Sequence, residues 1–153
     1  MRNSVDVHNH LVERDVRHEL LTVRGRLRTP ERLAAVLGLP PAQVGKIVVY
    51  EADGAPVVAV VPADTAPDPG RVGRALGAKE VKATSSARAS ELSDYIPEAI
   101  PPVALPAGFR VLVDRTLAAQ EVVYFTAGDP AAVLKLRGED LIRAADAAVA
   151  DLV

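Results

Sequence analysis

Two β-rich runs joined by Asp53-Gly54 constrain the fold of this chain more than any other feature. The stretch "VGKIVVYEADGAPVVAVVPAD", which begins at Val44, places β-branched residues on both sides of that dipeptide. Asp-Gly favours the tight turn of a two-residue β-hairpin, because both central residues need positive φ. We therefore predict an antiparallel hairpin here, and its runs are apolar on both faces.

Helices and strands alternate along the rest of the chain. Thr29 can cap a helix that Gly38 closes, and Asp68 starts a second helix that ends near Gly77. The proline-rich stretch 94–109 is expected to be an ordered surface loop. Further strands are expected over 17–23, 80–84, 109–114, 121–127 and 131–137, and further helices over 86–92 and 139–152.

The order of these elements indicates an α/β fold. A second hairpin, joined by Gly128-Asp129-Pro130, follows the first one later in the chain. Two antiparallel hairpins argue against a doubly wound parallel sheet. We predict a single domain over residues 1–153, with a mixed, mostly antiparallel, barrel-like sheet surrounded by helices.

The composition excludes several classes of protein and site. Aromatic residues make up 3% of the chain, so the core must consist of aliphatic side chains. Without cysteine there is no thiolate nucleophile, no disulfide framework and no cysteine zinc site. The N-terminus is charged and no segment is long and apolar enough to span a bilayer, so we expect a cytoplasmic protein without a membrane contact.

Charge is distributed unevenly along the chain. The net charge is −2, yet the first 50 residues hold eight Lys/Arg against five Asp/Glu. This distribution fits a local phosphate contact better than a broad nucleic-acid surface. Solvated surface charge explains Arg24, Arg26, Arg28 and Arg32 equally simply.

Lys46 lies where the first run of the hairpin begins. With a period of two, Lys46 shares one face with Val48 and Tyr50, while Ile47 and Val49 share the other. Since both faces are apolar, the ammonium must lie either at the solvated end of the strand or inside a cleft. Periodicity alone leaves both open, because burial of an unpaired lysine is costly.

The stretch "TPERLAAVLGLPPAQVGKIVVYEADGAPVVAVVPAD" resembles the early signature of the YbaK/EbsC family, the editing domain associated with prolyl-tRNA synthetase. The similarity continues through "ALGAKEVKATS", "VLVDRTLAAQEVVYFTAG" and "GEDLIRAADAAVADL", so it covers nearly the whole chain. The matching residues of the first stretch are Ala34 or Ala35, Leu37, Gly38, Pro40, Gln43 and Lys46.

This resemblance implies a trans-editing aminoacyl-tRNA deacylase, which hydrolyses the ester of a mischarged tRNA. It implies that Lys46 holds a phosphate near the 3′ acceptor end of the tRNA. Prolyl-tRNA synthetase or another synthetase is a candidate partner, and neither a metal nor an organic cofactor is implied. The alternative is a catalytically altered or inactive binding module that uses the same cleft for an adenosine-ended or other small ligand.

The loop "DYIPEAIPPVALP" (94–106) differs from the family pattern. Asp94, Glu98 and Ala104 occupy positions where the resemblance implies glycine. Glu98 and Ala99 are our candidates for catalytic residues beside Lys46. Glu98 can point to solvent, can contact the substrate's α-ammonium or act as a general base, or can mark a lost or altered activity.

Other polar residues of the chain have a functional and a structural explanation. Thr84 and Ser85 can line the pocket or cap a helix, and Asp114 can orient pocket groups or end its strand. His8 and His10 can bind a metal from a strand, but a solvated terminal tail is the simpler explanation. The residues that we predict to bind substrate are His18, Thr84, Ser85, Ile100, Pro102, Asp114 and Gly128.

Overall fold

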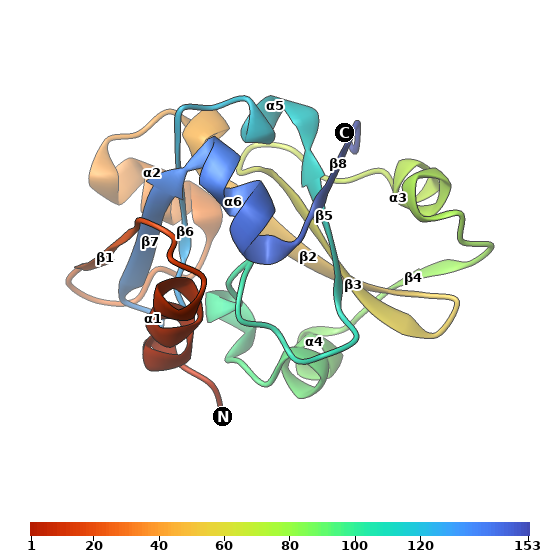
Figure 1. The fold of residues 1–153 in the computed structure, drawn as a ribbon, viewed down its shortest axis with the longest axis horizontal. Helices are drawn as coiled ribbons and strands as arrows, with labels where there is room; N and C mark the ends of the chain where they lie inside the picture. The colour runs from red at the N-terminus through yellow and green to blue at the C-terminus, as the bar shows by residue number, and fades with distance from the viewer.

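The structure, a computed structural model, describes residues 1–153 and contains two β-sheets surrounded by helices (Figure 1). The larger sheet has the order β4-β2-β3-β5-β8, and the smaller has the order β1-β7-β6. The strands are β1 (Glu19–Thr22), β2 (Gly45–Ala52), β3 (Ala55–Pro62), β4 (Val81–Ala83), β5 (Arg110–Asp114), β6 (Val122–Thr126), β7 (Ala132–Arg137) and β8 (Ala148–Ala150). The helices are α1 (Ser4–Glu13), α2 (Pro30–Leu37), α3 (Pro69–Leu76), α4 (Ser86–Ser93), α5 (Arg115–Ala118) and α6 (Gly138–Ala145), with 3-10 turns η1 (Pro41–Gln43) and η2 (Pro97–Ala99).

The predicted hairpin forms the centre of the larger sheet. β2 and β3 pair antiparallel over their full length, from Gly45 opposite Pro62 to Ala52 opposite Ala55. Asp53 and Gly54 both have positive φ, as a two-residue hairpin turn requires. The prediction from the Asp-Gly pair is therefore confirmed.

The larger sheet is mixed, as predicted. β2 pairs antiparallel with β3 and β4, whereas β3–β5 and β5–β8 are parallel. The smaller sheet is antiparallel throughout, with β7 between β1 and β6. The two sheets do not close into one cylinder, so "barrel-like" describes them only loosely, while the α/β class with surrounding helices is confirmed.

β3 is buried on both faces because hydrophobic clusters cover both sides of the larger sheet. Val58 and Val60 lie in the main core, together with side chains of α1, α6 and the smaller sheet. Val57 and Ala59 lie in a second core on the opposite face, beside α3. This arrangement explains why the hairpin sequence is apolar at successive positions.

Local capping signals fix the helices near the site. Thr29 caps α2 through a hydrogen bond from the Arg32 amide, and Gly38 ends that helix in the left-handed conformation. Ser85 caps α4 in the same way. These boundaries agree with the sequence prediction.

The two ends of the chain differ from the prediction. Residues 4–13 form the capped helix α1, with Val7 and Leu11 fully buried, so the proposed solvated tail around His8 is wrong. The last helix ends at Ala145 because Asp146 turns into the left-handed region. The chain then forms β8 beside β5, where a continued helix was expected.

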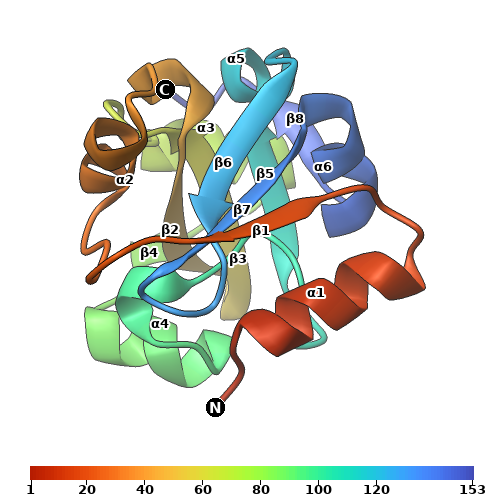
Figure 2. The ribbon, with the colours of Figure 1, turned by 90° about the vertical axis from the view of Figure 1, so that its left-hand side faces the viewer.

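No helix of the structure has the length and apolar character that a bilayer span needs. Figure 2 shows α1 and α6 on one side of the smaller sheet, with α2 and α4 on the other. The hairpin end that carries Lys46 belongs to the side with α2.

We predict that Gly45→Ala destabilises the protein by about 1–3 kcal/mol, because overpacking in a close contact forces neighbouring atoms to move. A Cβ at Gly45 would overlap the Phe125 ring, which lies where β2 meets β6. Gly70→Ala is the matched control, since the added methyl group there meets only ordinary or slightly tight contacts. Equal denaturant midpoints for the two variants would contradict this account of the junction.

Candidate active site

Lys46 occupies the beginning of β2, on the face that carries Val48 and Tyr50. Its Nζ donates a hydrogen bond to the Thr65 carbonyl oxygen at 2.9 Å and lies 3.4 Å from Oε1 of Glu31. Only 27% of the side chain is exposed. The ammonium is therefore neither in bulk water nor buried without a partner.

Glu31 holds Lys46 from the first turn of α2. Its pKa is lowered by a hydrogen bond from its own backbone amide and further by the charge of Lys46, while partial desolvation opposes the shift. The carboxylate therefore stays ionised and neutralises the lysine near neutral pH. An anionic ligand at Lys46 has to share the ammonium with Glu31 or displace it.

Arg26 and Glu98 form a second charge pair at the site. Arg26 extends from the connection between β1 and α2 and bonds the carboxylate of Glu98 in η2. The Glu98 side chain is 20% exposed, so of the three alternatives for this residue the structure disfavours an orientation toward open solvent. Glu98 has no positive φ, so its backbone bears none of the strain expected at a glycine position.

The turn η2 packs against the end of β6. The Gly128 amide donates to the Ala99 carbonyl oxygen at 2.9 Å, and Thr126 Oγ1 donates to the Ile100 carbonyl oxygen at 3.1 Å. Gly128 has φ +89°, and a Cβ there would lie 2.7 Å from the Asn3 backbone, so only glycine fits. The structure thus brings Ala99, Ile100 and Gly128 together.

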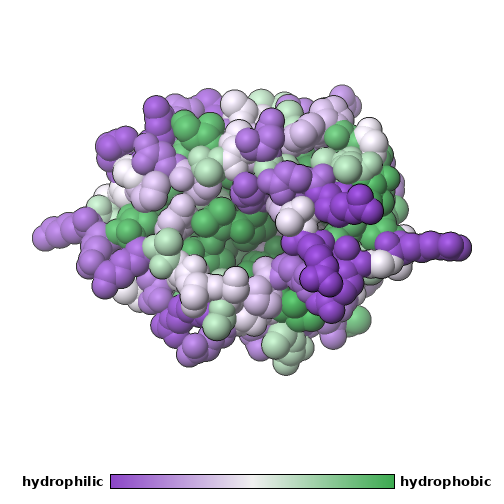
Figure 3. All heavy atoms as spheres, turned by 180° about the vertical axis from the view of Figure 1, so that it is seen from behind, coloured by the Kyte–Doolittle hydropathy of each residue, from purple (hydrophilic) through white to green (hydrophobic).

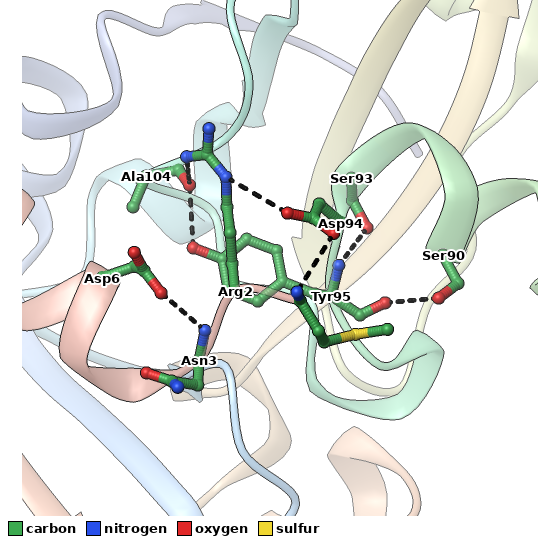
Figure 4. Close-up of polar contacts among 9 residues, drawn as sticks. Arg2, Asn3, Asp6, Ser90, Ser93, Asp94, Tyr95 and Ala104 are labelled. Atoms are coloured by element: carbon green, nitrogen blue, oxygen red, sulfur yellow. Dashed lines mark hydrogen bonds and ion pairs between the residues drawn. The ribbon is translucent and has the colours of Figure 1, made fainter.

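The ends of the 94–106 loop are held by a buried tyrosine. Tyr95 is fully buried, and its hydroxyl donates to the Ala104 carbonyl oxygen at 2.8 Å (Figure 4). Both Asp94 and Ala104 adopt positive φ, 63° and 58°. Desolvation raises the pKa of Tyr95 to about 12.

The first residues of the chain hold the same loop from outside. The Arg2 amide donates to the Asp94 carbonyl oxygen at 2.7 Å, and Arg2 Nη1 donates to the Ala104 carbonyl oxygen at 3.0 Å (Figure 4). The Ser4 amide donates to Oδ2 of Asp129, beside Gly128. The N-terminal segment therefore connects the loop to the β6–β7 turn.

Thr84 and Ser85 lie at the opposite end of β2. Thr84 Oγ1 donates to the Val49 carbonyl oxygen at 2.9 Å, and the Ser85 hydroxyl caps α4. Both hydroxyl groups thus have structural partners. A contact with substrate stays a prediction for both residues.

The edge of β2 opposite β3 has no strand partner between its two ends. Val44 forms a bridge with Tyr124, and pairing with β4 begins only at Tyr50. The Ala63 amide donates a hydrogen bond to the Val44 carbonyl oxygen. Val44 and every second residue after it therefore direct their backbone N–H and C=O groups toward β3. Ile47 consequently directs its backbone N–H and C=O toward the open edge.

An apolar hollow lies near the middle of the face turned away in Figure 1 (Figure 3). Figure 2 places α2, β2 and α4 toward this side of the molecule. Ile47 and Val48 of β2 are partly exposed. The elements α2 and β2, which carry Glu31 and Lys46, therefore lie toward the side of the molecule that shows the apolar hollow.

Three predicted residues lie elsewhere. His18 borders a cavity of about 400 Å³ on the smaller sheet, and Pro102 borders one of about 180 Å³ beside α1 and α6. Lys46 borders neither cavity. Asp114 is 2% exposed and accepts hydrogen bonds from Thr116 and the Leu152 amide, which gives it a structural role at the start of α5.

The histidines near the N-terminus do not build a metal centre. His8 Nδ1 lies 3.0 Å from Nε2 of His18, and His10 Nε2 contacts the Ala144 carbonyl oxygen. No group of three or more His, Cys, Asp or Glu side chains in the structure is arranged to hold a metal ion.

Several residues that complete the site were not predicted. The sequence indicated Arg26 only as surface charge and Tyr95 only as part of a loop, and it gave no sign of a role for Glu31. The motif spacing gave no sign of their partners, because 72 positions separate Arg26 from Glu98. The fourth, Thr126, is a buried hydroxyl at the end of β6.

These features define an α/β protein with a paired, partly buried lysine at the start of β2 and a structured proline-rich loop packed on the main core. Residues 25–144 match the family model of the aminoacyl-tRNA editing domain. The chain belongs to this family, which confirms the resemblance to YbaK-like proteins.

Two solved structures are similar over nearly their whole length. The crystal structure of hypothetical protein APE2540 superposes with a TM-score of 0.90 at 28% identity, covering 96% of this chain and 98% of that one. A proposed trans-editing enzyme for prolyl tRNA synthetase has a TM-score of 0.86 at 21% identity, covering 97% and 95%. A search of curated proteins found no significant match.

We predict that Ala104→Gly stabilises the protein by about 0.5–1 kcal/mol, because glycine adopts φ 58° without the strain of a Cβ. The matched control is Ala107→Gly in the same loop, where φ is not positive and added chain entropy should be neutral or destabilising. Thermal unfolding of both variants tests this. Stabilisation by both, or by neither, would contradict it.

We predict that Tyr95 causes a loss of stability at alkaline pH. Its pKa is about 12 in the folded protein, above the ordinary value of about 10. Because the fold favours the neutral phenol, this contribution is complete below about pH 10 and decreases as the pH rises toward 12.

Urea unfolding of wild type and Tyr95→Phe at several pH values measures this effect. The variant should be about 1 kcal/mol less stable near neutral pH, since one hydrogen bond to Ala104 is lost. The difference should shrink above pH 10. A constant difference from pH 8 to 11.5 would refute the assignment.

Proposed function

We propose that this protein hydrolyses the ester bond of mischarged aminoacyl-tRNA. The observation that carries the proposal is a partly buried, positioned ammonium at Lys46 in a chain of the aminoacyl-tRNA editing family. We propose further that the chain acts as one editing domain, in trans, in the cytoplasm, where charged tRNA is used.

Lys46 binds a phosphate of the tRNA 3′ end in this proposal. A lysine ammonium is a compact charge with three donors, so it does not require the planar bidentate geometry of arginine. Thr65 already fixes its position through the carbonyl oxygen. The phosphate replaces Glu31, whose side chain is half exposed.

The reaction needs a positioned water and hydrogen-bond donors for the carbonyl oxygen. The water oxygen bonds to the ester carbon, the bond to the ribose oxygen breaks, and the ribose oxygen takes up a proton. Donors that face the developing oxyanion lower the barrier. The Ala99 amide already donates to Ile96, so the amides of Glu98 and Ile100 are the candidates in this loop.

Glu98 is our candidate for binding the α-ammonium of the amino acid or for accepting a proton from water. Arg26 contacts this carboxylate and so orients it within the loop. Ala99 contributes through its backbone, since its carbonyl oxygen fixes the Gly128 turn.

The remaining candidates for substrate contacts differ in their support. Thr84, Ile100 and Gly128 border β2 or η2, where the ester would lie. Ser85 follows Thr84 at the α4 cap. His18, Pro102 and Asp114 have contacts in other parts of the molecule, and their role in binding stays a prediction.

The substrate of this proposal is the acceptor end of an aminoacyl-tRNA, and a synthetase is the candidate partner. The name of one structural relative connects that protein with prolyl tRNA synthetase. At 21% identity this relative supports the fold, and the partner is part of the proposal. The amino acid that is removed depends on the shape of the acyl site.

We predict that Lys46→Ala lowers kcat/KM for deacylation about 10–100-fold, the loss expected for a charge-assisted contact of about 1.5–3 kcal/mol. The assay is deacylation of a panel of mischarged tRNAs. Lys82→Ala on β4 is the control, because this lysine is 70% exposed and lies outside the site.

The same assay separates the enzyme from the alternative binding module. Turnover by wild type that the Lys46 variant loses supports the deacylase. Binding of tRNA without turnover, by both wild type and Glu98→Gly, identifies a non-catalytic module. Turnover gained only by Glu98→Gly marks a site that this glutamate has disabled.

A further inference from the structure

We propose that Arg24, Arg28 and Arg32 form a docking surface for the sugar–phosphate backbone of an RNA, beside the candidate active site. We call these three residues the arginine face. The choice of RNA as the ligand rests on the proposed function. In this proposal the stem of the bound RNA lies on the arginine face.

The three side chains are exposed and have no partner within the chain. None of them forms an ion pair or a side-chain hydrogen bond, whereas Arg26 and Lys46 in the same region are both paired with carboxylates. The segment from Arg24 to Arg32 contains one acidic residue, Glu31, and its carboxylate contacts Lys46. The arginine face thus carries three uncompensated positive charges in a chain whose net charge is −2.

The backbone beneath these charges is fixed. The amides of Val23 and Leu27 donate to the carbonyl oxygens of Ala131 and Pro130, at 2.9 and 2.7 Å. The Leu27 side chain is 1% exposed and anchors the segment in the core below α2. A loop that is ordered before binding loses less entropy when an extended ligand docks on it.

Residues that neighbour the arginine face in the sequence contact the candidate site. Arg26, between Arg24 and Arg28, contacts Glu98 of η2, and Glu31, next to Arg32, contacts Lys46. Figure 2 shows β1 leading into this segment and the segment leading into α2. An RNA whose 3′ end reaches Lys46 would therefore pass this segment.

Arginine suits this task because its planar guanidinium binds phosphate oxygens in a bidentate manner. Phosphate contacts position a nucleic acid without reading its sequence. They also release counterions, so affinity falls with salt by a slope of about 0.7–0.9 for each phosphate contacted.

The test measures binding of an uncharged RNA minihelix with a CCA end by fluorescence anisotropy at several salt concentrations. The variant is Arg24→Gln/Arg28→Gln/Arg32→Gln. The control is Arg74→Gln/Lys79→Gln/Arg110→Gln, which removes the same charge from unpaired residues around α3 and β5. Leu27 is intact in both, and thermal unfolding checks the fold.

We expect the first variant to weaken binding at least 10-fold at low salt and to reduce the salt slope by about 2, while the control changes affinity less than 3-fold. Equal losses in both variants would show a net-charge effect and overturn the proposal. The proposal is also overturned if the arginine-face variant binds the minihelix as tightly as wild type, which leaves an acidic protein as the partner of this surface. The same holds if wild type does not bind the minihelix.

Deacylation of an aminoacylated CCA trinucleotide separates this proposal from the proposed function. The trinucleotide lacks a stem, so the arginine-face variant should cleave it at the wild-type rate, while Lys46→Ala should show the loss of about 10–100-fold predicted above. If no variant or wild type cleaves any ester, yet minihelix binding depends on the arginine face, the docking surface stands and the deacylase does not.

Discussion

The register of the β2–β3 hairpin is the constraint on which the candidate site depends, because it places Lys46 at the end of β2. β3 is enclosed by hydrophobic clusters on both faces, so the register of β2 beside it is fixed. A shift of one residue would exchange Lys46 with Ile47 and place an ammonium in the main core. The fold therefore specifies the place of the charge as strictly as it specifies the core.

Charge compensation is the second principle of the site. Lys46 is balanced by Glu31 in the first turn of α2, and Glu98 by Arg26 in the connection that leads from β1 into α2. Partly buried charges are tolerated because they are paired. Such pairs also raise the affinity that an anionic ligand needs, because the ligand must compete with a carboxylate for Lys46 or Arg26. The unpaired arginines of the same segment raise the local concentration of anions that can do so.

Much of the fold could be predicted because its signals are local. The Asp53-Gly54 turn and the caps at Thr29 and Ser85 depend only on neighbouring residues. The helix α1 was missed although Asn3 and Asp6 form a capping box, because a charged terminus suggested a tail. β8 was missed because an alanine-rich segment favours helix, and only pairing with β5 makes it a strand.

The site could be predicted only in part. The resemblance offered Lys46 and the 94–106 loop as candidates, but contacts between distant segments form their surroundings. The hydrogen bond from Tyr95 to Ala104 and the pair of Arg26 with Glu98 have no signature in the sequence. Local spacing could not show that His18 would lie on the smaller sheet.

A crystal structure with a non-hydrolysable aminoacyl-adenosine amide that carries a 5′-phosphate tests the central claim most directly. The account predicts that Lys46 Nζ leaves Glu31 and lies within hydrogen-bond distance of the phosphate, with the amide carbonyl oxygen facing η2. A ligand bound elsewhere, with Lys46 still held between Thr65 and Glu31, would contradict it.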